Sequence, residues 1–92
     1  MNENIDRAYE LLKKCLDHED GDERIAFGED SVREADLSGD ITMQIVTRLT
    51  LVRAATFGGA TEKALVGFSW LLAQLDENPD VFVLHYLYSA HI

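Results

Sequence analysis

One stretch of the sequence, residues 58–75 (GGATEKALVGFSWLLAQL), constrains the fold more than any other. Its apolar side chains recur at the spacing of one helical stripe, at Ala64, Phe68, Leu71, Leu72 and Leu75. A helix of this kind cannot bury its apolar stripe alone, so it must pack against neighbouring elements. The two glycines that precede it predict a sharp break between two helices.

The remaining sequence is divided by similar breaks, and it predicts an all-α chain of about five helices. The predicted ranges are 4–17, 22–37, 41–57, 61–76 and 80–92. Asn2 or Asn4 can cap the first helix, while Gly39 can end the second and Asp40 can cap the third. The second helix has few large apolar residues, so we expect it to be the most exposed. The segment 80–92 is rich in Val, Phe and Tyr, which favour strands. Asn-Pro before it and the lack of a partner strand favour a helix.

The spacing Ala64-x3-Phe68 resembles the second helix of a tetratricopeptide (TPR) repeat. In the helix before it, Leu51 is the one position that fits the family pattern. A poorer copy lies 38 residues earlier, where Gly21 and Ala26 fit but Asp30 replaces the aromatic residue. The resemblance implies a TPR-like α-solenoid fragment, an array of antiparallel helix hairpins. It also implies that Ala64 lets two helices approach closely and that Phe68 fills the space between them.

The resemblance to TPR proteins further implies where a partner would bind. In those proteins the first helix of each hairpin lines a groove, which here corresponds to Val46, Leu49, Arg53, Thr56 and Phe57. The matching positions of the first copy are Leu11, Cys15 and His18. The Lys and Asn residues with which some TPRs clamp a C-terminal carboxylate are absent from these positions. The expected partner is therefore a protein or peptide other than an acidic chaperone-type tail.

Length and composition predict one domain, residues 1–92, with enough apolar residues to fold. No run of about 18 apolar residues or secretory signal is apparent, and Cys15 is the single cysteine, so a cytoplasmic location is expected. The net charge of −9 is concentrated in residues 17–40, which hold ten acidic and two basic residues. This segment would repel nucleic acid. It either solvates an exposed face or docks a basic partner.

Residue clusters that could carry chemistry are few. Cys15 and His18 have the spacing of a metal pair, but a zinc site needs three or four ligands. The acidic loop 17–23 lacks the first carboxylate of a calcium-binding EF-hand. No phosphate-binding or nucleophile motif occurs. Trp70 lies one residue away from the apolar stripe and is expected to pack between helices, with a ligand platform as the alternative reading. We therefore expect no enzyme activity, no cofactor and no metal.

The sequence thus predicts a protein–protein interaction or scaffold module. Alternatives are an N-terminal regulatory fragment of a larger signalling protein or enzyme and, less favoured, a small metal-dependent enzyme. The predicted helix 80–92 is apolar on most sides, and solenoids normally end in a polar helix. We therefore expect either a homodimer or a longer helical array, with self-association through Phe82, Tyr86 and Leu87.

Overall fold

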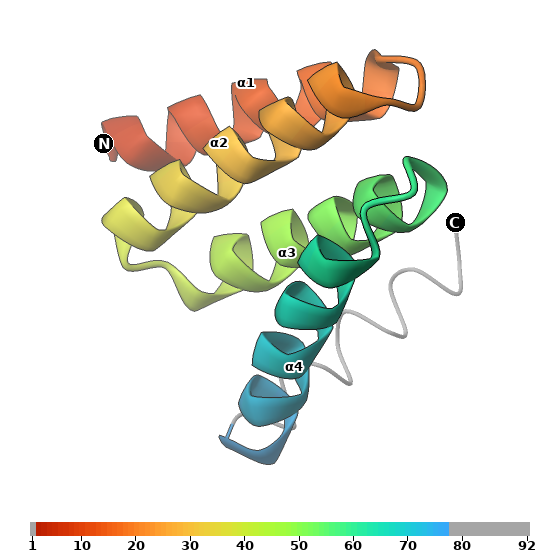
Figure 1. Ribbon diagram of the computed structural model, residues 1–92. Coiled ribbons are helices and arrows are strands. Elements are labelled where there is room, and N and C mark those ends of the chain that lie inside the picture. The colour runs from red at the N-terminus through yellow and green to blue at the C-terminus, as the bar shows by residue number, and fades with distance from the viewer. Residues whose placement is uncertain (1, 78–92) are drawn as a thin grey trace, which may run out of the picture.

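The computed structural model describes residues 2–77, and all of the regular structure in that range is helical (Figure 1). The four helices are α1 (Glu3–Asp17), α2 (Asp22–Ser38), α3 (Ile41–Phe57) and α4 (Thr61–Glu77). The all-α prediction is confirmed for this range, and each helix boundary lies within one residue of its predicted position. The predicted fifth helix, with its self-association residues Phe82, Tyr86 and Leu87, lies outside the described residues.

Local signals explain why the helices begin and end where they do. The Asn2 side chain accepts hydrogen bonds from the backbone N–H groups of Asn4 and Ile5, and the Asp40 side chain accepts one from Met43. Both satisfy N–H groups that have no partner within the first helical turn. Gly39 ends α2 with a φ of 74°, a conformation that only glycine adopts without strain. These caps confirm the predicted breaks.

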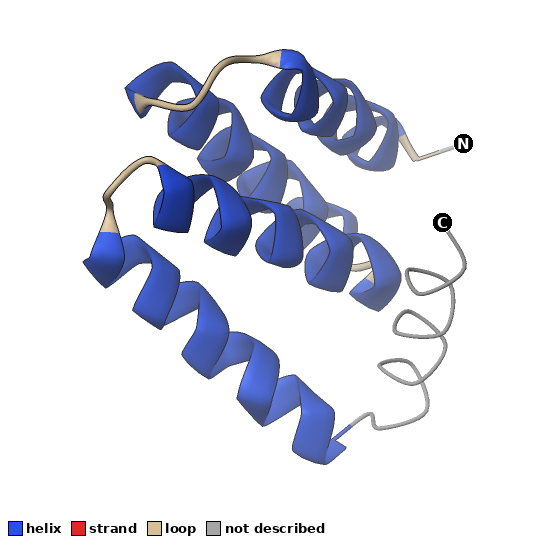
Figure 2. Ribbon diagram, turned by 90° about the vertical axis from the view of Figure 1, so that its right-hand side faces the viewer, coloured by secondary structure: helices blue, strands red, loops and turns tan. Residues whose placement is uncertain are grey.

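The helices form two antiparallel hairpins joined by short loops (Figure 2). Helix α3 packs against both α1 and α2, whereas α4 packs mainly on α3 and runs steeply away from the first hairpin (Figure 1). A core cluster of Cys15, Ile25, Leu51 and Ala54 joins α1, α2 and α3. The first three helices therefore share one core, and α4 extends from it.

Helix α2 lies between α1 and α3, so the prediction that it would be the most exposed helix is wrong. Its buried face consists largely of small residues, Gly28, Ser31 and Ala35, together with Ile25. A Cβ on Gly28 would lie 3.1 Å from the Cδ1 atom of Leu51 and 3.5 Å from the Cys15 Sγ atom. The helices approach closely at this point because the side chains are small.

Helix α4 is held against α3 through Gly67 and Leu71, its two buried residues. A Cβ on Gly67 would lie 2.7 Å from the Cγ2 atom of Val52, so the two helices are in close contact here. Ala64 is only partly buried, and Phe68 is 52% exposed. The expectation that Phe68 fills the space between the two helices is therefore wrong, since Gly67 occupies the point of contact.

Candidate functional site

The groove residues that the sequence implied on α3 are largely exposed, and we call them the α3 stripe. Leu49, Arg53, Thr56 and Phe57 are exposed, and Val46 is partly buried. They lie on the side of α3 opposite to Leu51, Ala54 and Ala55, which face the core. Phe57 is 66% exposed although it is one of the largest apolar side chains. The structure therefore brings the five residues together on one open helix face.

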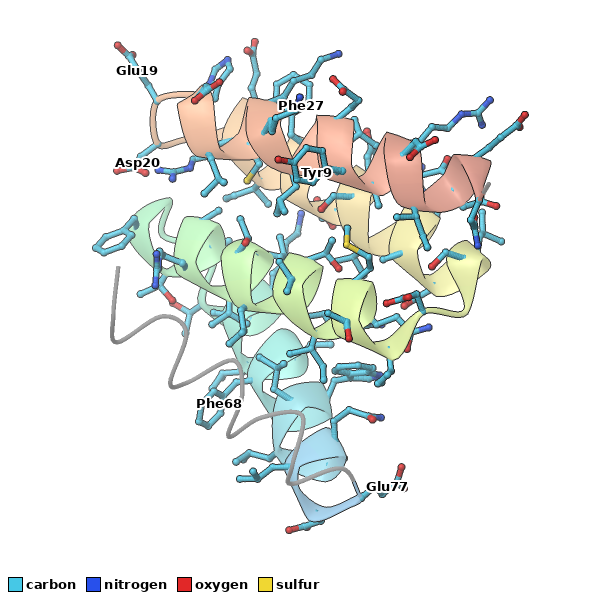
Figure 3. The ribbon with its side chains drawn as sticks, turned by 180° about the vertical axis from the view of Figure 1, so that it is seen from behind. Tyr9, Glu19, Asp20, Phe27, Phe68 and Glu77 are labelled. Atoms are coloured by element: carbon cyan, nitrogen blue, oxygen red, sulfur yellow. The ribbon has the colours of Figure 1, made fainter. Side chains whose placement is uncertain are left out.

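Helix α1 adds two exposed apolar residues, Tyr9 and Leu16, which we call the α1 pair. They are seven residues apart and so share one face of the helix. Tyr9 projects on the face of α1 that borders α3 in Figure 3, and α1 and α3 are in contact. The α1 positions that the resemblance implied are different. Cys15 is fully buried and cannot line a groove, so that expectation is wrong.

A third set of exposed apolar residues runs along α4, and we call it the α4 stripe. Its members are Leu65, Phe68, Leu72 and Leu75, at intervals of three, four and three residues. The stripe lies beside the Gly67–Leu71 face that contacts α3. The ring of Phe68 projects outward from α4 in Figure 3. Four large apolar side chains at helical spacing form a continuous strip that the described residues leave open.

On the other side of α4, a groove of about 370 Å³ runs between α2 and α4 across α3. The Arg48 guanidinium lies over the Trp70 ring, 3.8 Å from its centroid, and donates two hydrogen bonds to Asp36 at 2.7 and 2.9 Å. At the other end, Lys63 pairs with Glu29 at 3.0 Å. The packing role expected for Trp70 agrees with these contacts. These polar side chains of the groove bond to one another between helices, so few of their donors and acceptors remain for a ligand.

Most of the acidic segment 17–40 is paired within the molecule. Six of its ten carboxylates contact a basic side chain or a histidine: Asp20 with Arg24, Glu23 with His18, Glu29 with Lys63, Asp30 with Arg33, Glu34 with Arg7, and Asp36 with Arg48. Glu34 also accepts a hydrogen bond from Asn4 at 2.8 Å. Three of these pairs join different helices. The segment therefore stabilises the packing of helices and is less available to a basic partner than its charge suggests.

The cysteine and histidine of the first hairpin do not form a metal site in the structure. Burial raises the pKa of the Cys15 thiol, and the nearby Arg24 guanidinium partly opposes this effect. His18 instead contacts Glu23 through Nε2 at 2.8 Å and lies against the Phe27 ring. Within residues 2–77, no group of three His, Cys, Asp or Glu side chains is placed to hold a metal ion. No helix in this range has the length and apolar character needed to cross a membrane.

Comparison with known proteins gave no relatives: neither a protein-family model, nor a curated protein, nor a solved structure matches this chain. Functional inference therefore rests on the surfaces themselves. The α3 stripe was implied from the sequence, whereas the α1 pair was not. The signal that could have identified the pair is its seven-residue spacing, one position beyond the buried stripe of Ala8, Leu12 and Cys15.

Proposed function

We propose that this protein is a protein–protein interaction module, which binds an apolar segment of its partner along the α3 stripe and the α1 pair. The observation that carries the proposal is the exposure of Tyr9, Leu16, Leu49 and Phe57 on two adjacent helices. Clustered exposed apolar residues usually mark an interaction site. Arg53 lies among them and supplies hydrogen-bond donors to fix the orientation of the bound segment, while the Thr56 hydroxyl, which donates to the Val52 carbonyl oxygen, can accept a hydrogen bond.

The stacked-hairpin arrangement is part of this proposal. Two antiparallel hairpins, with α3 packed against α1 and α2, are compatible with a TPR-like array. In such an array the first helices of the hairpins face the partner, and here these are α1 and α3. A location in the cytoplasm and self-association through Phe82, Tyr86 and Leu87 complete the proposal. Docking of a basic partner on residues 17–40 is less favoured, because most of those carboxylates already have partners.

A displayed library of random peptides of about 15 residues tests the proposed surface directly. Peptides selected on the intact chain are expected to contain apolar anchors. Their affinity should fall by about tenfold or more when Leu49→Asp or Phe57→Asp places a charge in the contact, since a lost apolar anchor costs about 1.4 kcal/mol or more.

The control is Ala73→Asp, which adds the same charge at an exposed position of α4 outside all three apolar surfaces. Circular dichroism melts establish that each variant is folded. Selected peptides that bind Leu49→Asp, Phe57→Asp and the intact chain equally well would show that the proposed surface is not used.

A further inference from the structure

The way in which α3 sits on the first hairpin shows what kind of element the α4 stripe accepts. Helix α3 contacts α2 along a strip that includes Ile25, Gly28 and Val32, and the fully buried Ala35 continues this strip on the same face of α2. Ile25 and Leu51 share the core cluster, Val32 packs against it, and Gly28 faces Leu51. The intervals along this strip are three, four and three residues.

The α4 stripe repeats the strip on α2 forty residues later. Leu65, Phe68, Leu72 and Leu75 follow Ile25, Gly28, Val32 and Ala35, position by position. On α2, three of the four positions are buried and Val32 is partly buried, whereas all four are exposed on α4. The α4 residues are also larger, so the apolar area that they leave open is larger. Helix α4 thus leaves exposed the positions that correspond to those at which α2 packs against α3.

The chain itself supplies an apolar segment at the right distance. Two residues, Gly39 and Asp40, connect α2 to α3. Two residues, 78 and 79, likewise separate the end of α4 from the predicted helix 80–92. Short connections place consecutive helices next to each other in antiparallel orientation. A segment that starts beside Leu75 can therefore run back along the stripe toward Leu65.

Length and composition of the segment also match the stripe. Thirteen helical residues span about 20 Å, and the ten helical steps from Leu65 to Leu75 span about 15 Å. The segment holds nine hydrophobic residues: Val81, Phe82, Val83, Leu84, Tyr86, Leu87, Tyr88, Ala90 and Ile92. Its only acid is Asp80, at the start, and it contains no Lys or Arg. Apart from His85 and His91, it would bring no charged side chain onto the apolar part of α4.

We propose that residues 80–92 of the same chain pack on the α4 stripe, in the position that α3 takes on α2. A second copy of the chain and an external partner are the competing occupants. The inference is independent of the proposed partner surface, which lies on α1 and α3, but it competes with self-association through Phe82, Tyr86 and Leu87, because the same segment is used.

Hydrogen–deuterium exchange of the full chain, read peptide by peptide, tests this proposal. Amides of residues 80–92 are expected to exchange slowly, and their rates should not change on dilution to a concentration at which sedimentation shows only monomer. Leu72→Glu should accelerate their exchange by about tenfold or more, because a buried carboxylate without a partner is strongly disfavoured. Ala73→Glu, next to it on the exposed side of α4, should leave the rates unchanged.

Exchange in α1 and α2 serves as the internal reference for folding, and Leu72→Ala provides a milder variant if the charge unfolds the domain. Fast exchange of residues 80–92 in the intact chain would overturn the proposal and leave the stripe to an external partner. Protection that disappears when the chain becomes monomeric would assign the stripe to a second copy. Protection that survives both Leu72 substitutions would also overturn the proposal, since the segment would then pack elsewhere.

Discussion

The guanidinium of Arg48 on α3 lies 3.8 Å from the centre of the Trp70 ring on α4, while its two terminal nitrogens donate hydrogen bonds to Asp36 on α2. A single side chain thereby connects three helices. It is only 13% exposed, so its interactions with the carboxylate and the ring are partly shielded from water. This contact fixes how α4 is oriented relative to the first hairpin.

Replacing Arg48 should therefore destabilise the domain and change the environment of Trp70. We expect Arg48→Ala to lower the free energy of unfolding by about 2–3 kcal/mol and to shift the tryptophan emission. Arg48→Lys should recover only part of the loss, because an ammonium group cannot reproduce the two parallel hydrogen bonds. Arg33→Ala, which removes an exposed pair within one helix, should cost less than about 0.5 kcal/mol. Equal losses for Arg48→Ala and Arg33→Ala in urea unfolding would contradict this account.

The close approach of α3 and α4 at Gly67 gives a second prediction. Helix propensity alone favours Gly→Ala by about 1 kcal/mol. A Cβ at this position would lie 2.7 Å from the Cγ2 atom of Val52, whose branched side chain has little freedom to move. We therefore expect Gly67→Ala to lower the free energy of unfolding by about 1–2 kcal/mol. Ser69→Ala, exposed on the same helix, should be neutral or slightly stabilising. A stabilising Gly67→Ala would show that the helices are not in close contact there.

The buried thiol of Cys15 predicts a dependence of stability on alkaline pH. Burial raises its pKa in the folded state above the ordinary value of 9.0, despite the nearby Arg24. The folded state therefore retains its proton at a pH where the unfolded state has lost it. The resulting stabilisation is complete below about pH 9 and is lost as the pH rises through the higher pKa of the folded state.

Measuring the free energy of unfolding of the intact chain and of Cys15→Ala between pH 8 and 11 tests this dependence. The intact chain should lose stability more steeply than Cys15→Ala, because only the intact chain has the buried thiol. Lysine and tyrosine side chains titrate in both proteins and so do not affect the difference. The thiol should also react with alkylating reagents only as fast as the domain unfolds. Identical slopes together with rapid labelling of the native protein would show that Cys15 is accessible.

The acidic residues that join helices should be more sensitive to charge reversal than those that do not. Glu34, 17% exposed, accepts a hydrogen bond from Asn4 and lies 3.9 Å from Arg7. We expect Glu34→Lys to lower the free energy of unfolding by about 1–2 kcal/mol, since Asn4 and Arg7 lose their acceptor. Glu19→Lys, at an exposed position in the loop after α1, changes the net charge equally and should have little effect. If both variants had similar thermal midpoints, the acidic segment 17–40 would only solvate the surface and would not stabilise the packing of helices.

The helix boundaries could be predicted from the sequence because caps act locally. Asn2, Gly39 and Asp40 each act within a few residues of their own position. The burial of α2 was missed because Gly28 and Ser31 bury little apolar area and so leave a weak apolar pattern. For the same reason a pattern based on large residues selected Phe68 as the contact, where the structure uses Gly67.

Contacts between residues that are far apart in the chain could not be predicted from the sequence either. Arg48 and Trp70 are 22 residues apart, and only the crossing of α3 and α4 brings them together. The α3 stripe was implied by the resemblance to TPR proteins, and four of its five residues are exposed, while their role in a groove stays a prediction. The seven-residue spacing of the α1 pair is visible in the sequence, but only the contact between α1 and α3 places the pair next to the α3 stripe. Pairing of the acidic segment depends in the same way on which helices are neighbours.

The most direct test of the proposed function is to map where a selected peptide binds on the full chain by nuclear magnetic resonance. The account predicts that amide shifts on titration cluster at the α1 pair and the α3 stripe, around Tyr9, Leu16, Leu49 and Phe57. The α2 amides between Glu29 and Asp36 should remain unchanged. Shifts confined to α2, with α1 and α3 unaffected, would contradict the account.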